Sequence, residues 1–269
     1  MIPKTIHYCW FGGKALPEQA VRCINSWKKF FPDYEIKEWN EENFDINICR
    51  YVREAYDCKK WAFVSDYARF WILYTYGGIY FDTDVEVIAP MNDIIEKGAF
   101  MGCEERDKSG SSDKNEVNPG LGIGAEPRMK LYKELMDLYE NESFIDSLGN
   151  MNLKNVVVRT TSILLKHGFL SNDNIEYISN VYIYPTDYFC PKNYYTGEVC
   201  ITKNTRTIHH YDASWLSKYD VKAHNIMKKK KKNIIEYKVR YMYVLFIKIV
   251  GMIDKYGVKG AFKYIKNKY

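Results

Sequence analysis

Short apolar segments alternate with longer segments of helical periodicity along the first 210 residues, and this alternation constrains the fold more than any other feature. Strand-like segments cover 2–10, 34–39, 79–81, 85–88, 99–104, 120–125, 181–184 and 206–210. Helical spacing of apolar residues covers 17–31, 60–76, 127–141 and 156–167. Such alternation is typical of an α/β sandwich with a mostly parallel sheet. The polar segment 106–119 predicts a loop, and we find no internal repeat.

Charge is divided unevenly along the chain. The 269 residues carry a formal net charge of +5, but residues 222–269 hold 14 Lys and Arg against 2 Asp and Glu, a net charge of +12. Residues 1–221 hold 25 basic and 32 acidic residues, a net charge of −7, which does not favour nucleic-acid binding. We therefore expect an enzymatic or binding domain over 1–221 and a basic, amphipathic helical tail over 222–269.

Cysteine usage and the apolar segments indicate the cellular compartment. Seven cysteines, with no C-x-x-C pair, argue against a disulfide framework or a zinc site and for reduced thiols. The first ten residues lack the pattern of a signal peptide, and the apolar stretch 241–253 is too short to span a bilayer. We expect a cytoplasmic protein.

Two carboxylates stand directly after the predicted strand 79–81. Asp82 and Asp84 flank Thr83, so in an extended segment both side chains point to the same side. The carboxyl end of a strand is where open α/β sheets bind ligands. A carboxylate pair suits Mn²⁺ or Mg²⁺, which can bridge a diphosphate. The alternative for so short a motif is a solvated turn.

Two further groups of polar residues stand near predicted element ends. Asp66 and Arg69 share one face of an otherwise apolar helix, where charges must be paired or used in binding. His209 and His210 end a late strand, where a neutral imidazole could complete a Mn²⁺ shell. The structural alternatives are an ion pair that holds the helix and histidines satisfied within the core.

Four segments together, in this order, carry a family resemblance. They are 2–13 (IPKTIHYCWFGG), 65–69 (SDYAR), 77–84 (GGIYFDTD) and 209–215 (HHYDASW). With them the chain resembles glycosyltransferase family 32, the DXD-motif sugar transferases that include capsular polysaccharide transferases, over about residues 1–218. The resemblance implies a GT-A (Rossmann-like) fold with a mixed central sheet, a nucleotide-sugar donor, a divalent cation and retention of anomeric configuration.

The resemblance also implies roles for single residues in binding the donor. Trp10 resembles the residue that stacks on uracil, with Tyr8 beside it in the donor site. Asp66 and Arg69 look like the pair that holds the donor sugar hydroxyls, and Tyr80 is similar to an aromatic residue that touches the donor.

The remaining roles concern the metal and the diphosphate. Asp82 and Asp84 look like the metal pair, and His209 or His210 resembles a third protein ligand. Ser214 and Trp215 look like a clamp on the diphosphate. The sequence does not identify a catalytic nucleophile. Retaining transferases of this fold can react on one face of the sugar, with the leaving phosphate itself deprotonating the acceptor.

The acceptor side follows the family pattern less closely. Where many relatives have a Gly-Pro element before a Leu-Thr helix, this chain has Arg159 to Leu164 (RTTSIL). The segment 118–122 (NPGLG) has small residues that would permit close approach of an acceptor, although a plain strand entry explains it equally well.

The function expected from these features is transfer of a hexose from a UDP-sugar, UDP-galactose or UDP-glucose, to a lipid-linked oligosaccharide. We place it in capsular or surface polysaccharide synthesis, with the basic tail on the anionic inner face of the cell membrane. The alternatives are a haloacid-dehalogenase-like phosphatase, from whose motif Glu86 departs, and a non-catalytic carbohydrate-binding protein. A glycoside hydrolase is a weaker alternative, because it needs two carboxylates flanking the bond.

Overall fold

The computed structural model describes residues 1–105, 115–194 and 197–211, together with parts of the segment from 219 to 257. The chain forms two compact units. The first comprises Met1–Asn193 and Val199–Tyr211, and the second comprises Tyr194–Glu198 and Asp212–Tyr269. All seven cysteines are free.

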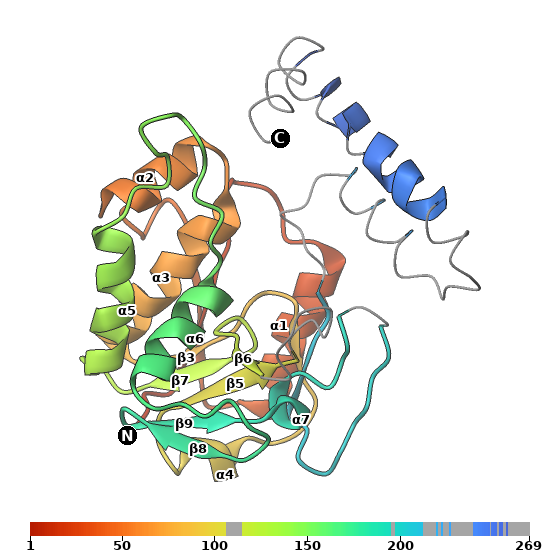
Figure 1. The fold of residues 1–269 in the computed structure, drawn as a ribbon. Coiled ribbons are helices and arrows are strands. Elements are labelled where there is room, and N and C mark those ends of the chain that lie inside the picture. Colours follow the sequence, from red (N-terminus) through yellow and green to blue (C-terminus); the bar gives the residue numbers. More distant parts are fainter. Residues whose placement is uncertain are drawn as a thin grey trace. The chain divides into compact units, whose positions relative to one another are not determined.

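A mixed sheet lies at the centre of the first unit (Figure 1). Its strands run in the order β2 (Glu35–Trp39), β1 (Thr5–Cys9), β3 (Gly78–Tyr80), β7 (Ile123–Ala125), β5 (Phe100–Glu104), β9 (Val181–Tyr184) and β8 (Glu176–Ile178), and β6 (Glu116–Val117) pairs with β5. A separate antiparallel pair joins β4 (Val85–Val87) to β10 (Thr207–His209).

Strand direction confirms an α/β fold with a mixed sheet and contradicts the mostly parallel arrangement. The pairs β1–β2, β1–β3 and β5–β9 are parallel. Strand β7 runs antiparallel to both of its neighbours, β3 and β5. Helices connect β1 to β2 and β2 to β3, as connections between parallel strands of one sheet require. Residues 118–122 between β6 and β7 are too few for a crossover helix, so the alternation on which the expectation rested stops there.

Helices cover both faces of the sheet (Figure 1). One face packs on α2 (Arg50–Asp57), α3 (Trp61–Tyr76), α5 (Lys130–Glu140) and α6 (Val156–Lys166), and the other packs on α1 (Glu18–Phe30), α4 (Asn92–Ile95) and α7 (Thr186–Phe189). Strand β3 shows the alternation clearly, because Tyr80 packs into the first layer while Ile79 and Phe81 pack into the second. Both layers are therefore built from the strands that carry the polar site.

The elements that sequence patterning missed are short. They are α2, α4, α7, β6 and β8, none longer than eight residues. Periodicity needs a longer window than these provide. The predicted loop 106–119 contains β6, and residues 106–114 of it lie outside the described part of the chain.

The turn into β3 fixes where the two aspartates emerge. Gly77 and Gly78 adopt φ values of 67° and 97°, and a Cβ on Gly78 would lie 2.6 Å from the Thr5 carbonyl oxygen. The imidazole of His7 contacts this turn, with Nε2 3.0 Å from the Gly77 carbonyl oxygen. Its Nδ1 accepts a hydrogen bond from Trp39 Nε1 at 3.1 Å. Burial lowers the pKa of His7 to about 4, so the imidazole is neutral and structural.

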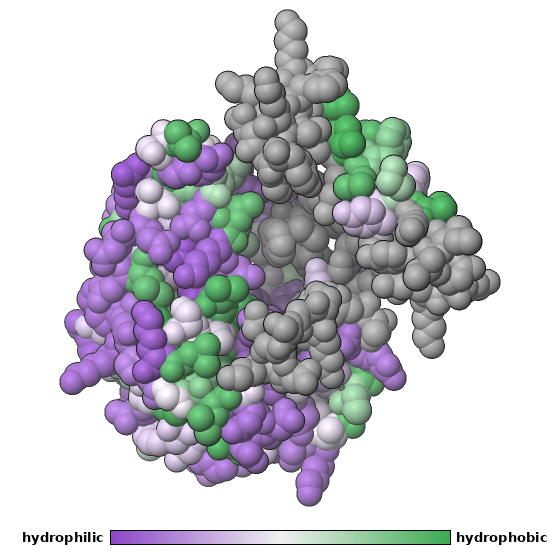
Figure 2. Space-filling model, in the orientation of Figure 1, coloured by the Kyte–Doolittle hydropathy of each residue, from purple (hydrophilic) through white to green (hydrophobic). Residues whose placement is uncertain are grey.

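The surface of the first unit drawn in Figure 2 is mainly polar, with scattered apolar residues. In the second unit, the described residues between 239 and 254 are helical, and Val244 and Ile247 pack with Tyr219 and Ile226. Among the helices in the described residues, none is both long enough and apolar enough to cross a bilayer.

Candidate active site

The polar residues singled out in the sequence gather at one edge of the sheet. Strand β3 is parallel to β1, and β5 has the same direction because β7 lies antiparallel to both β3 and β5. The residues that follow these strands, Trp10 and Asp82, therefore lie at the same edge as Glu104, which ends β5. This is the edge at which open α/β sheets bind ligands.

Arg69 joins helix α3 to the first aspartate of the motif. Its Nη2 lies 2.9 Å from Oδ1 of Asp66 and 3.3 Å from Oδ1 of Asp82, and its Nε donates to the Ser65 carbonyl at 3.1 Å. The guanidinium also lies over the Tyr80 ring, 5.0 Å from its centroid. Because one side chain faces two carboxylates, the sequence-based pair becomes a triad of Asp66, Arg69 and Asp82.

The charges in this triad are strongly coupled. Burial raises the pKa of Asp66 to about 6 against the opposing charge of Arg69. Burial also raises the pKa of Asp82. The charge of Arg69 lowers this pKa, and the charge of Asp84 raises it further. Arg69 stays protonated, because the carboxylates outweigh its desolvation and raise its pKa. The hydroxyl of Tyr80 donates to Oδ1 of Asp82 at 3.0 Å, which fixes the carboxylate further.

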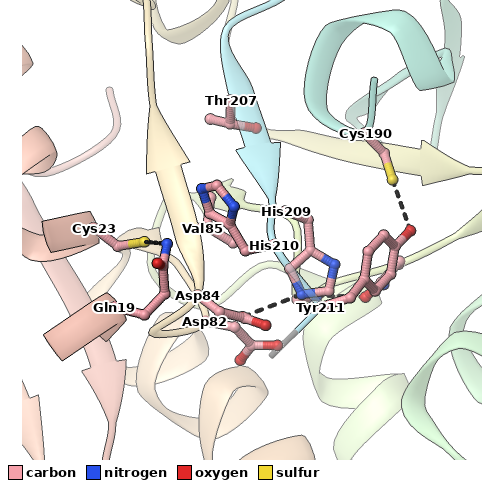
Figure 3. Close-up of polar contacts among 12 residues, drawn as sticks. Gln19, Cys23, Asp82, Asp84, Val85, Cys190, Thr207, His209, His210 and Tyr211 are labelled. Atoms are coloured by element: carbon pink, nitrogen blue, oxygen red, sulfur yellow. Dashed lines mark hydrogen bonds and ion pairs between the residues drawn. The ribbon is translucent and has the colours of Figure 1, made fainter. Parts of the chain in front are cut away.

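Asp84 faces the imidazole of His209, which arrives from the late strand β10. The pairing of His209 with Val85 brings Nε2 of His209 to 3.1 Å from Oδ1 of Asp84. In Figure 3, Asp82 and Asp84 lie on one side of the His209 ring and Tyr211 lies on the other. The Asp84 backbone accepts a hydrogen bond from the His210 N–H at 2.9 Å.

The two histidines have different surroundings. His210 directs Nε2 to Oε2 of Glu86 at 2.8 Å, whereas His209 faces the motif. Burial lowers the pKa of His209, but the hydrogen bond and charge of Asp84, together with Asp82 and Glu104, raise it overall. Its Nδ1 is buried and has no hydrogen-bond partner among the described residues. His209 is therefore the better placed of the two for a role at the carboxylates.

The carboxylate pair fits a hard divalent cation. Side chains of Asp82 and Asp84 are 29% and 16% exposed, so both reach the surface of the site. Among the described residues, no group of three or more His, Cys, Asp or Glu side chains surrounds a common point. Mg²⁺ in particular is usually bound by one or two carboxylates, with phosphate oxygens and water completing its shell. The residues present are consistent with that mode.

The segment 118–122 lies against the motif. The Asp82 N–H donates to the Gly120 carbonyl at 3.2 Å, and the Gly120 N–H donates to Oδ1 of Asn118 at 2.7 Å. A Cβ on Gly120 would lie only 2.2 Å from Oδ2 of Asp82. Strand β7 begins at Ile123, so this segment is a loop that leads into β7 and lies closely beside Asp82.

The aromatic residues expected to bind the donor have distinct positions. Trp10 is half-buried just after β1, and its indole donates to the Lys14 carbonyl. Tyr8 is buried against Trp27, with its hydroxyl donating to Glu38 at 2.7 Å. Ser214 and Trp215, expected to clamp the diphosphate, lie outside the described residues.

Arg159, where the chain departs from the family pattern, is part of the core. Its guanidinium is fully buried, lies over the Tyr139 ring at 4.6 Å and pairs with Glu142 at 2.8 Å. Its Nε donates to the Lys154 carbonyl at 3.1 Å. These contacts make it a structural residue that stabilises the start of α6.

Sequence patterning did not single out Glu104 or Tyr211. Oε2 of Glu104 accepts from Asn118 Nδ2 at 2.8 Å and from the Tyr211 hydroxyl at 3.3 Å. Glu104 carried a usable signal, because it is the polar residue that ends a predicted buried strand at the ligand-binding edge. Tyr211 carried none, since its contacts depend on tertiary structure.

The residues of the site lie largely within a segment that is similar to a known protein family. Residues 17–101 match the family described as glycosyltransferase sugar-binding region containing DXD motif. This range contains Asp66, Arg69 and both aspartates of the motif. The similarity to DXD-motif glycosyltransferases therefore rests on this part of the chain.

Similar proteins match only part of their own length. Inositol phosphoceramide mannosyltransferase 1 of Schizosaccharomyces pombe is 31% identical over 111 residues, which cover 37% of this chain and 33% of that protein. Inositol phosphoceramide mannosyltransferase 3 of the same organism is 34% identical over 108 residues, covering 37% and 29%. The chain thus spans about a third of the length of the curated relatives that it matches.

One solved structure that matches part of this chain is the PaToxG glycosyltransferase. It superposes with a TM-score of 0.44 at 18% identity, over 61% of this chain and 69% of that chain. Because this TM-score is low, the fold is described only by the strand order and register given above.

Proposed function

We propose that this protein is a metal-dependent glycosyltransferase that moves a hexose from a UDP-sugar to a hydroxyl of a glycan acceptor. The observation that carries the proposal is the shared edge at which Asp82 and Asp84 meet Arg69 and His209, within a family-matched sugar-binding region. We further propose UDP-galactose or UDP-glucose as the donor and retention of anomeric configuration.

In this proposal, different residues bind different parts of the donor. Asp82 and Asp84 would hold Mn²⁺ or Mg²⁺, which when bound neutralises the diphosphate as it departs. Asp66 and Arg69 offer directional hydrogen bonds to sugar hydroxyls, and Arg69 also fixes the Asp82 carboxylate. Trp10 offers a half-buried aromatic face for the base.

The chemistry then needs no protein nucleophile. The bond between the sugar C1 and the diphosphate oxygen breaks, and a new bond forms between C1 and the acceptor oxygen. The proton of the acceptor hydroxyl passes to the departing diphosphate oxygen. The task of the protein in this step is to orient donor and acceptor and to exclude water.

A screen of nucleotide sugars tests this proposal. UDP- and GDP-hexoses are incubated with the full chain and Mn²⁺, and release of the nucleoside diphosphate is followed, with Asp84→Ala as the inactive control. Turnover of a UDP-hexose that needs Mn²⁺ and Asp84 supports it. A chain that neither binds nor hydrolyses any nucleotide sugar refutes it, and hydrolysis of an aryl phosphate alone would favour the phosphatase alternative.

For the acceptor we propose a lipid-linked oligosaccharide of capsular or surface polysaccharide synthesis, used at the inner face of a bacterial membrane. The second unit supports this placement. Its helical residues Val239, Met242, Phe246, Ile249 and Ile253 are exposed and recur at intervals of three and four, so they share one face of a helix. Together with the net charge of +12 in residues 222–269, this face suits an anionic bilayer surface.

Vesicle binding tests the membrane proposal separately. Sedimentation with phosphatidylglycerol vesicles should capture the full chain, while phosphatidylcholine vesicles should not. The double variant Met242→Asp, Phe246→Asp should lose binding without losing nucleotide-sugar hydrolysis. Equal sedimentation of this variant, or of a chain truncated after residue 221, would contradict the proposal.

A further inference from the structure

Two series of contacts, called arms below, start at the Glu104 carboxylate. One leads through Asn118 and the other through Tyr211. The carboxylate ends β5 in a half-buried position at the ligand-binding edge, and its Oε2 accepts from both Asn118 and Tyr211. Burial raises its pKa, and the Asn118 hydrogen bond and the charge of His209 oppose that shift. The roles in donor binding and metal binding proposed above do not involve the Glu104 side chain.

The first arm leads from Glu104 to Asp82. Nδ2 of Asn118 donates to Glu104 at 2.8 Å, and Oδ1 of the same amide accepts from the Gly120 N–H at 2.7 Å. The Gly120 carbonyl then accepts from the Asp82 N–H at 3.2 Å. Both ends of the Asn118 amide are thus engaged, so Glu104 fixes the orientation that holds the loop against the first aspartate.

The second arm leads from Glu104 to Asp84. The Tyr211 hydroxyl lies 3.3 Å from Oε2 of Glu104 and 2.9 Å from Sγ of Cys190. The Tyr211 ring stands 4.2 Å from the ring of His209, whose Nε2 faces Asp84 at 3.1 Å. Tyr211 has a φ of 57°, a conformation that is unfavourable for a non-glycine residue, so its side-chain contacts must hold it there.

We infer that Glu104 is a positioning residue, which sets Asp82 through Asn118 and Gly120 and sets Asp84 through Tyr211 and His209. The inference deepens the proposed function and rests on it for the catalytic consequence. The role requires an acceptor oxygen for two donors and does not require a negative charge. Glutamine supplies such an oxygen, and leucine does not.

Two substitutions at Glu104 separate positioning from other roles. Removal of partners that orient metal ligands typically lowers affinity 10- to 100-fold, so we expect Glu104→Leu to weaken Mn²⁺-dependent UDP binding by about that factor. Glu104→Gln should stay within about threefold of the wild type. The matched control is Glu140→Leu, which removes the carboxylate that accepts from the Tyr67 hydroxyl at 2.9 Å, and it should lower only the melting temperature.

Two outcomes of the binding experiment overturn the inference. If Glu104→Gln binds UDP normally but loses kcat, the charge acts in catalysis directly. If Glu104→Leu binds UDP as the wild type does, the side chain does not position the aspartates. If the leucine variant does not fold, Tyr211→Phe, which breaks one arm only, should give a smaller loss of UDP affinity with Glu104 intact.

A histidine spectrum separates this inference from the proposed function. At one fixed pH, without metal or nucleotide, the His209 side-chain resonances should move in Glu104→Leu and Tyr211→Phe, because the neighbouring ring is released. The resonances of His7, held by Gly77 and Trp39, should stay in place. A wild-type chain that binds no UDP while His209 still moves refutes the proposed function and supports the linkage. Unmoved His209 resonances overturn the linkage.

Discussion

Adding one methyl group at Gly120 should disable the site while leaving the fold intact. The new Cβ would lie 2.2 Å from Oδ2 of Asp82, more than 1 Å closer than an ordinary van der Waals contact. Either the Asp82 carboxylate rotates away from Arg69 or the loop retreats from the motif. Overpacking of this kind costs about 1–3 kcal/mol. A misplacement of about 1 Å in a catalytic site can lower the rate about 100-fold.

The assay compares two glycine substitutions in the same sheet region. For Gly120→Ala we expect kcat/KM for the nucleotide sugar to fall about 100-fold and the melting temperature to fall by about 2–4 °C per kcal/mol. Gly124→Ala is the matched steric control, because its Cβ would lie 2.3 Å from Cε1 of Phe100 and the three nearest atoms all belong to the Phe100 ring. It should lose stability but keep the donor affinity of the folded protein. A Gly120→Ala enzyme with unchanged kcat/KM would refute the contact between Gly120 and Asp82.

Three further expectations follow from the site and its supports. Asp84→Ala should abolish Mn²⁺-dependent UDP binding measured by calorimetry, whereas His210→Ala should change it less than threefold, and equal losses would contradict the different placement of the two residues. Arg69→Met should cost about 3–5 kcal/mol in urea unfolding by leaving Asp66 without its cation, and adding Asp66→Asn should recover part of that loss, with simple additivity as the contrary result. Because the folded-state pKa of His7 lies near 4, below the ordinary 6.5, its contribution to stability is complete above pH 6.5 and is lost as the pH falls toward 4, by about 3 kcal/mol. His7→Gln should therefore have a shallower dependence of unfolding free energy on pH, and parallel curves would argue against a neutral buried imidazole.

Sequence patterning predicted the long elements and the motif because both have local signals. Helix α3 follows from apolar periodicity that ends at a double glycine, and Asp82 and Asp84 follow from their position after a buried strand. The proximity of Arg69 to Asp82, in contrast, depends on how α3 packs beside β3, which no local pattern encodes.

The direction of β7 shows a second limit. A three-residue strand gives too short a window to establish its partner, so only the register with β3 and β5 revealed the antiparallel step in the sheet. The sequence also could not predict the different surroundings of His209 and His210. Adjacent residues on a strand point to opposite sides, and the sequence does not state which side faces the motif.

The β4–β10 pairing has a consequence for how the protein is made. The motif is complete at residue 84, but the imidazole that faces Asp84 arrives with residue 209, more than a hundred positions later along the chain. A ribosome-bound chain that ends between these points can form α3 and the contact between Arg69 and Asp66, yet it has no His209 to place beside the motif. During synthesis, the carboxylate site can therefore be completed only after residue 209 has been added, and its completion requires the closure of a long loop.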